Sequence, residues 1–226
     1  MNDFKDKVVY QIYPKSFMDS NGDGFGDLKG VTAKLDYLAD LGVDYLWLTP
    51  FFPSPQRDNG YDVADYRAVD PRYGTMEDLE ELIREADRRG IGLMLDMVFN
   101  HTSTEHEWFK KALAGDKRYQ DYYIFKDGTP DHYPTNWVSK YGGPAWEYVP
   151  CLGKWYLHLF LLEAGEIFLE HRLAAANQQL CRGVSLGQQG VLATQGTCLH
   201  RQGRHQQQPQ NRFHFALHLN SMAPSE

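Results

Sequence analysis

The stretch Asp96-Met97-Val98-Phe99-Asn100-His101 decides the fold of this chain. Its first four residues end an apolar run at residues 91–99, and this run predicts a strand buried on both faces. Asp96 lies inside that run, and a buried carboxylate is costly unless it is hydrogen-bonded or paired. We therefore expect Asp96 and Asn100 to support the side chain of His101, which follows at the strand's carboxyl end.

Two shorter strands are predicted upstream, at residues 8–13 and 45–48. Apolar residues recur at three- and four-residue steps within residues 28–41, which predicts an amphipathic helix, and a second helix is predicted at residues 75–89. Strands and helices that alternate at this spacing indicate βαβ units and a parallel sheet. The polar clusters then lie at the carboxyl ends of the strands, where parallel sheets carry functional residues.

Composition excludes several classes of partner. The 226 residues carry a net charge of −7 with a pI near 5.7, so we expect no nucleic-acid partner. The amino terminus has no signal-peptide core, and no apolar run approaches 18 residues, so we expect no membrane partner. Three cysteines show neither metal-site spacing nor a disulfide framework. A cytoplasmic location fits best.

The loop Asp19-Ser20-Asn21-Gly22-Asp23-Gly24-Phe25-Gly26-Asp27 has hard oxygen ligands at alternate positions and glycines that permit a tight wrap. This pattern suits Ca²⁺ or Mg²⁺. It is not an EF-hand, because Gly30 stands where that motif has its bidentate Glu and a strand, not a helix, precedes the loop. A loop of Asx turns that binds no metal is the alternative interpretation.

A second polar cluster, Asp58-Asn59-Gly60-Tyr61-Asp62, follows the second predicted strand. A site for one hexose ring needs a carboxylate for the hydroxyls, an aromatic face and a donor at the ring edge. Asp58, Tyr61 and His101 supply these groups from the ends of two strands. The alternative is structural: Asp58 caps a turn, Tyr61 packs, and His101 is a satisfied buried polar residue.

Regular patterns are lost over residues 100–160, which we interpret as a long insertion over the mouth of the sheet. Glu105, His106 and Glu107 predict the start of a short helix with a solvated face. The abundant aromatic residues predict the core of this subdomain; they are Trp137, Trp146, Trp155 and Tyr156.

Four motifs occur in order: residues 9–17, 19–30, 58–62 and 96–101. Over residues 8–160 the chain resembles the oligo-1,6-glucosidase branch of the α-amylase family, and within that branch it looks closest to trehalose-6-phosphate hydrolases. The resemblance implies a (β/α)₈ TIM barrel. Residues 1–99 would form its first three βα units, and residues 100–160 a small domain inserted after the third strand.

The resemblance also implies retaining hydrolysis of α-glucosidic bonds, of trehalose 6-phosphate to glucose and glucose 6-phosphate, by an Asp nucleophile and a Glu acid/base about 5 Å apart. Oligo-1,6-glucosidase activity, or a non-catalytic remnant that binds carbohydrate or calcium, are the alternatives. The substrate would be a small carbohydrate, and the glucose ring would be gripped by Asp58, Tyr61 and His101. A structural Ca²⁺ would be held by Asp19, Asn21, Asp23, the carbonyl of Phe25, and Asp27.

Residues 161–226 differ in composition, because they contain ten Gln but no Asp and no Lys. The family's nucleophile motif on the fourth strand, Gly-Phe-Arg-Leu-Asp, does not occur there. We therefore expect a poorly ordered tail foreign to the family, an incomplete barrel, and a chain that is inactive alone. Three strands would leave an open sheet edge, which favours aggregation.

A frameshift near the codon for Phe160 would explain the tail. Shifted by one base, the codons of residues 200–207 are compatible with Ile-Gly-Lys-Asp-Asp-Ile-Asn, which is typical of the family after its nucleophile motif. Resequencing the gene from the codon for Leu157 tests this hypothesis. We expect a restored frame that encodes Gly-Phe-Arg-Leu-Asp, and the absence of any open, family-like alternative frame would contradict it.

Overall fold

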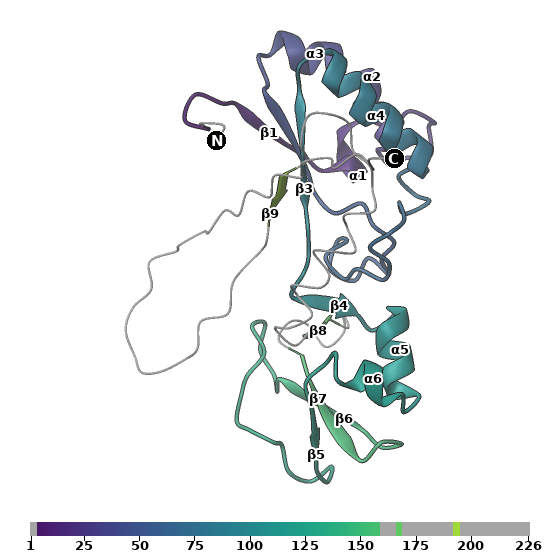
Figure 1. Cartoon of the computed structure of the whole chain (residues 1–226), viewed down its shortest axis with the longest axis vertical. Helices are drawn as coiled ribbons and strands as arrows, with labels where there is room; N and C mark the ends of the chain where they lie inside the picture. The colour runs from purple at the N-terminus through teal and green to yellow at the C-terminus, as the bar shows by residue number, and fades with distance from the viewer. Residues whose placement is uncertain (1–3, 159–165, 169–191, 195–226) are drawn as a thin grey trace, which may run out of the picture. The chain divides into compact units, whose positions relative to one another are not determined.

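The computed structural model describes residues 4–158, 166–168 and 192–194 (Figure 1). The chain divides into two compact units. The first unit contains Met1–Thr49, Glu77–Met97 and Ser185–Glu226, and the second contains Pro50–Met76 and Val98–Val184. The loop after the second strand and the residues after the third strand therefore belong to the same unit.

The first unit is built on a parallel sheet, as the sequence predicts. Its strands are β1 (Val9–Ile12), β2 (Tyr45–Leu48), β3 (Gly92–Asp96) and β9 (Leu192–Thr194), in the order β1-β2-β3-β9. β3 is shorter than predicted, although Met97, which follows it, is buried.

The expectation of a sheet of only three strands is wrong, although the order β1-β2-β3-β9 is still that of an open sheet within the described residues. β9 pairs with β3 in parallel, with Leu192 opposite Met94 and Thr194 opposite Asp96. A second short strand from the tail, β8 (Glu166–Phe168), belongs to the second unit. The rest of residues 161–226, and with it the expectation of poor order there, lies outside the described residues.

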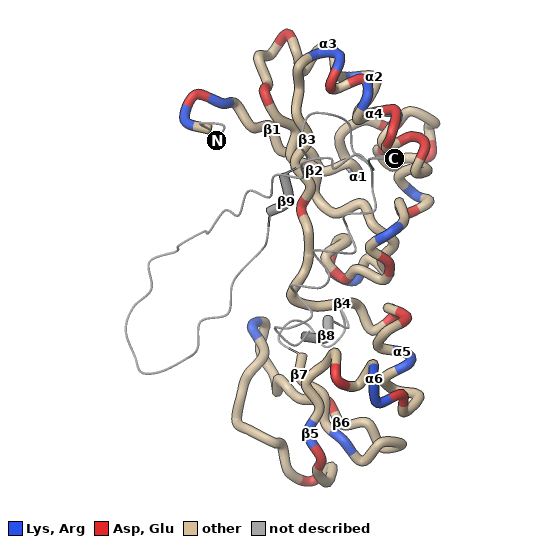
Figure 2. The backbone as a smooth tube through the Cα atoms, in the orientation of Figure 1, with Lys and Arg blue, Asp and Glu red and all other residues tan. Residues whose placement is uncertain are grey.

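The helices of the first unit are α1 (Pro14–Phe17), α2 (Leu28–Ala33), α3 (Leu35–Asp40) and α4 (Met76–Arg88), and Figure 1 shows α2, α3 and α4 grouped beside the sheet. The single helix predicted over residues 28–41 is interrupted at Lys34, whose ψ of 6° is not helical. The predicted apolar face is buried at Leu28, Val31, Leu35 and Leu38, but Leu41, which was predicted to share it, is 52% exposed. The charged residues in the first half of α4 are all Asp and Glu, and Arg occurs only in its second half, so no basic stripe runs along the helix (Figure 2).

The second unit is more regular than expected. It contains β4 (His101–Ser103), α5 (Glu107–Leu113), α6 (Lys117–Gln120), β5 (Phe125–Asp127), β6 (Trp146–Val149) and β7 (Lys154–Leu157). β5, β7 and β6 form an antiparallel sheet, and β4 pairs with β8. The predicted short helix is confirmed, because α5 begins at Glu107.

The aromatic core of the second unit was predicted correctly except at one position. Trp146, Trp155 and Tyr156 are buried on β6 and β7. Trp137 is 54% exposed, so its assignment to the core is wrong. The Trp137 carbonyl accepts a hydrogen bond from the Ala145 amide. This bond fixes the backbone of Trp137, while its side chain remains exposed.

Candidate functional site

The candidate site lies in the second unit, where a loop at residues 50–76 meets β4. Three hydrogen bonds fasten the loop to the strand, and we call them the clasp. His101 Nε2 donates to the carbonyl of Tyr61 (3.1 Å), the Ser103 amide donates to the carbonyl of Val63 (2.9 Å), and the Tyr66 hydroxyl donates to the carbonyl of His101 (2.6 Å). Because a carbonyl oxygen only accepts, the Nε2 atom of His101 carries a proton.

The clasp is shielded from water. His101 is 4% exposed, the other two residues of β4 are fully buried, and Tyr66 is buried as well. A buried hydrogen bond that loses one partner leaves the other unsatisfied, which costs about 1–3 kcal/mol. The position of the loop on β4 is therefore strongly specified.

The turn that carries Asp58 and Tyr61 depends on left-handed backbone. The Tyr61 amide donates to the Asp58 carbonyl at 3.0 Å, and the two residues between them, Asn59 and Gly60, have φ of 50° and 98°. A Cβ atom on Gly60 would also lie 3.0 Å from the carbonyl oxygen of Pro50, so both the conformation and the space require glycine. The turn keeps Asp58 and Tyr61 at its two ends, and both side chains are partly exposed.

The three residues predicted to hold a sugar are thus brought together. Asp58 and Tyr61 share one turn, and His101 binds the carbonyl of Tyr61. In this structure the Nε2–H of His101 is used within the protein. His101 therefore fixes the turn, whatever contact it also makes with a ligand.

Sequence reasoning gave no role to Asp62, which secures the base of the turn. It is completely buried, and its carboxylate accepts from Ser54 Oγ at 2.6 Å and from the Arg57 amide at 2.8 Å. The Ser54 hydroxyl also accepts from the Gln56 amide, whose residue has a positive φ of 60°. The sequence offered no specific signal for this role, because Asp is rarely fully buried and only the structure shows its hydrogen bonds.

A second buried carboxylate closes the loop at its other end. Asp70 accepts from the Ser54 amide (3.3 Å), and from the backbone amide and Nε of Arg72 (3.0 and 2.9 Å). Arg72 also donates to the Ser54 carbonyl. The loop is therefore preorganised by charge-assisted hydrogen bonds that involve neither Asp58 nor Tyr61.

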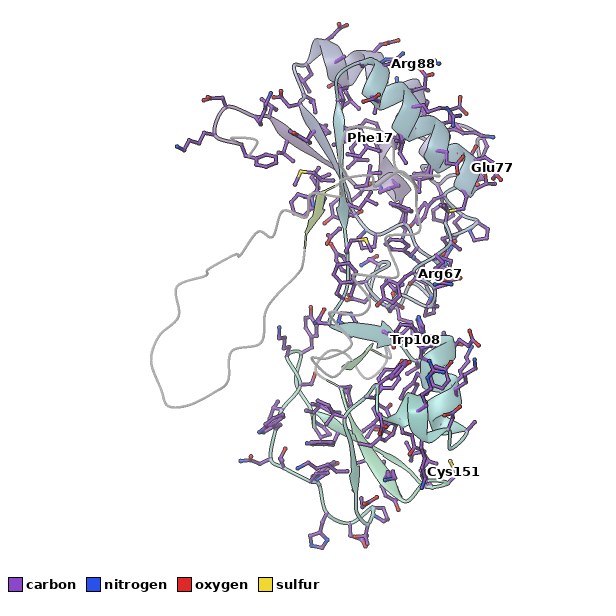
Figure 3. All side chains as sticks on the ribbon, viewed as in Figure 1. Phe17, Arg67, Glu77, Arg88, Trp108 and Cys151 are labelled. Atoms are coloured by element: carbon purple, nitrogen blue, oxygen red, sulfur yellow. The ribbon has the colours of Figure 1, made fainter. Side chains whose placement is uncertain are left out.

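His106 supports the clasp from the side of α5. Its Nδ1 accepts from the Trp108 amide at 3.1 Å and so caps the helix, and its ring packs between those of Tyr66 (5.6 Å) and Trp108 (4.6 Å); Figure 3 labels Trp108 at the start of α5. Burial lowers the pKa of His106 to about 4. The negative charges of Asp65 and Glu107 raise this pKa, but by less than burial lowers it. The imidazole is therefore neutral near pH 7, as a hydrogen-bond acceptor must be.

The acidic residues beside His106 are solvated, as predicted. Hydrogen bonds from Lys110 and Lys111 lower the pKa of Glu105 and Glu107 respectively, and both carboxylates are exposed.

Asp96 is buried at the end of β3 and has a partner, as its place in an apolar strand requires. Asp96 belongs to the first unit and Asn100 to the second, so their supporting role stays a prediction.

The acidic loop of the first unit is a series of Asx turns. The side chains of Asp19, Asn21 and Asp23 accept from the amides of Asn21, Asp23 and Phe25, at 3.0, 2.9 and 2.8 Å. Asp27 caps α2 by accepting from the Gly30 amide at 2.7 Å. The loop's oxygen donors fit Ca²⁺ chemically. Within the described residues, however, no three His, Cys, Asp or Glu side chains cluster as metal ligands.

The sequence matches the model of a known protein family. Residues 11–177 match the family described as "Alpha amylase, catalytic domain". The chain belongs to this family of glycoside hydrolases. The match continues beyond Phe160, where sequence analysis placed the end of the resemblance.

Curated relatives agree with the branch inferred from the motifs. The trehalose-6-phosphate hydrolase of Escherichia coli (strain K12) is 56% identical over 164 residues, which cover 73% of this chain and 30% of that protein. The oligo-1,6-glucosidase of Parageobacillus thermoglucosidasius is 52% identical over 158 residues, covering 70% and 28%. The chain therefore spans less than a third of the length of these relatives.

Solved structures give the same result. The trehalose-6-phosphate hydrolase of Bacillus licheniformis matches with a TM-score of 0.73 and 50% identity, over 78% of this chain and 32% of that one. A mutant of the trehalulose synthase MutB matches with a TM-score of 0.72 and 48% identity, over 77% and 31%. The described strands thus correspond to part of a TIM-barrel enzyme.

No helix in the described part of this chain is long and apolar enough to span a membrane.

The low pKa of His106 predicts an acid-sensitive second unit. Between pH 6.5 and about 4 the unfolded chain binds a proton at His106 that the folded chain does not, so stability falls as the pH decreases through this range. Well above pH 6.5, the contribution of His106 to the free energy of unfolding does not change with pH. From pH 7.5 to 5.0 we expect a loss of about 2 kcal/mol of unfolding free energy from this residue.

His106→Asn supplies the matched control, because Asn keeps a capping oxygen but does not titrate. Urea unfolding followed by tryptophan fluorescence at each pH gives the difference in unfolding free energy between the two proteins. That difference is expected to shrink or reverse toward pH 5, and a difference that stays constant from pH 7.5 to 5.0 would contradict the assignment.

Proposed function

We propose that this chain forms the sugar-binding part of an α-glucosidase-type glycoside hydrolase that acts on trehalose 6-phosphate and yields glucose and glucose 6-phosphate. The observation that carries the proposal is the clasp, which joins the turn bearing Asp58 and Tyr61 to His101. Support for the substrate comes from the trehalose-6-phosphate hydrolases of Escherichia coli and Bacillus subtilis, 56% and 55% identical to this chain. We place the enzyme in the cytoplasm.

In this proposal each residue has a distinct task. The Asp58 carboxylate accepts hydrogen bonds from ring hydroxyls, and the Tyr61 ring stacks on the apolar face of glucose. His101 borders the same ring and holds Tyr61 through its carbonyl. Cleavage with retention needs a nucleophilic Asp and an acid/base Glu, and we assign neither to a described residue of this chain.

Oligo-1,6-glucosidase activity is the second candidate, because proteins of that name are 47–52% identical to this chain. The substrates of the two candidates differ in their linkage, α,α-1,1 against α-1,6, and in whether the second sugar carries a phosphate. A comparison of trehalose 6-phosphate with isomaltose as ligands therefore separates them.

Substitution of Asp58 tests the sugar site. Titration calorimetry with trehalose 6-phosphate is expected to show binding by the unaltered chain, and Asp58→Asn is expected to weaken that binding about 10- to 100-fold, as loss of a charged hydrogen bond does. Asp65→Asn is the matched control, because Asp65 is an exposed carboxylate of the same loop that accepts from the Arg67 amide and takes no part in the clasp.

Equal affinity of the Asp58 and Asp65 variants would contradict the role of Asp58. Tighter binding of isomaltose than of trehalose 6-phosphate would replace the proposed substrate with that of an oligo-1,6-glucosidase. No binding of either sugar by the unaltered chain would overturn the sugar site.

We further propose that the loop of residues 19–27 binds a structural Ca²⁺ through Asp19, Asn21, Asp23, the carbonyl of Phe25, and Asp27. Hydrogen bonds from the amides of Gly24 and Gly22 lower the pKa of Asp19, which favours its ionised form. A loop preshaped by Asx turns would lose little conformational freedom when it binds an ion.

Calcium is expected to raise the melting temperature of the chain relative to EDTA. Asp23→Asn is expected to abolish most of that increase, because Asn keeps the Asx turn to Phe25 but removes a charge. Calorimetry that detects no Ca²⁺ binding, together with equal melting temperatures in calcium and EDTA, would leave the loop as a set of Asx turns without a metal.

A further inference from the structure

Tyr66 has no part in the sugar contacts proposed above, yet it makes the shortest hydrogen bond of the clasp. Its hydroxyl donates to the His101 carbonyl at 2.6 Å, across 35 residues of sequence. The side chain is 7% exposed and therefore buried.

The Tyr66 ring is held by aromatic neighbours. The Phe52 ring lies 6.1 Å away and the His106 ring 5.6 Å away, each measured between centroids. His106 is itself fixed as the cap of α5. Packing thus restricts the rotamer of Tyr66, and a restricted rotamer aims the hydroxyl in one direction.

His101 is consequently held at two points by one short segment. Its carbonyl accepts from Tyr66, and its imidazole Nε2 donates to the carbonyl of Tyr61. The first contact fixes the backbone and the second fixes the ring, so the orientation of the imidazole relative to Tyr61 is determined. Without the Tyr66 hydroxyl, the backbone of His101 can shift and the bond from the imidazole to Tyr61 weakens.

We propose that Tyr66 is a positioning residue that sets the orientation of His101, and through it of Tyr61, for binding of a glucose ring. This inference rests on the proposed function for its consequence in binding. Tyr66 acts through His101 and does not touch the sugar. A purely structural Tyr66 would only fill the space between Phe52 and His106, which phenylalanine fills equally well.

Tyr66→Phe separates these two roles, because it removes the hydroxyl and keeps the ring. The first readout is the pair of imidazole ¹⁵N signals of His101 in long-range ¹H–¹⁵N spectra, assigned by their disappearance in His101→Asn. The unaltered chain is expected to show the Nε2–H tautomer, and Tyr66→Phe is expected to move the signals toward a mixture of tautomers.

The second readout is affinity for trehalose 6-phosphate, which we expect Tyr66→Phe to lower about five- to tenfold, as loss of one neutral hydrogen bond does. Tyr73→Phe is the matched control. Tyr73 is a buried tyrosine of the same loop whose hydroxyl lies 3.5 Å from Gln56 Oε1 and makes none of the three hydrogen bonds of the clasp. The control is expected to leave the His101 signals and the affinity unchanged.

Unchanged His101 signals in Tyr66→Phe would overturn the proposal, and so would shifted signals with unchanged affinity. A fall in affinity of the same size in Tyr73→Phe would also overturn it, because the effect would then belong to the loop in general. If the unaltered chain binds no sugar, the proposed function fails. The His101 signals then still decide whether Tyr66 positions the imidazole.

Discussion

The clasp between the loop at residues 50–76 and β4 is the constraint on which the candidate site depends. His101 contributes both an acceptor and a donor to it, and its partners, Tyr66 and Tyr61, lie 35 and 40 residues earlier in the sequence. Because His101 and Tyr66 are buried and the bond to Tyr61 is partly buried, the turn of Asp58 and Tyr61 is placed on β4 without help from a ligand. A site prepared in this way loses less conformational entropy on binding.

Buried side chains of the same unit support the clasp. Asp62 and Asp70 tie the loop to Ser54 and Arg72, and His106 joins Tyr66 to the start of α5. These are buried carboxylates with satisfied hydrogen bonds and a neutral imidazole kept uncharged by burial. They account for the order of the loop, whereas Asp58 and Tyr61 remain partly exposed for contact with a sugar.

The sequence predicted the parallel strands well, because apolar runs bounded by polar and glycine residues are local signals. It also predicted that Asp58, Tyr61 and His101 come together, since strand ends share one edge of a parallel sheet. It could not show the clasp, because all three of its acceptors are backbone carbonyls that any residue type supplies. Trp137 was assigned to the core from its residue type alone, and the pairing of β9 with β3 has no periodic signal in so short a strand. Alternating Asp and Asn residues predict an Asx-turn loop and a calcium loop equally, so the pattern at residues 19–27 did not separate them.

The central claim is that the clasp presents Tyr61 and Asp58 to a glucose ring while His101 holds the turn. A crystal structure of the chain with bound trehalose 6-phosphate tests it most directly. The account predicts a glucose ring stacked on Tyr61, a hydroxyl within hydrogen-bond distance of the Asp58 carboxylate, and His101 Nε2 still donating to the Tyr61 carbonyl. A sugar bound elsewhere, or a His101 imidazole turned away from that carbonyl in the complex, would contradict it.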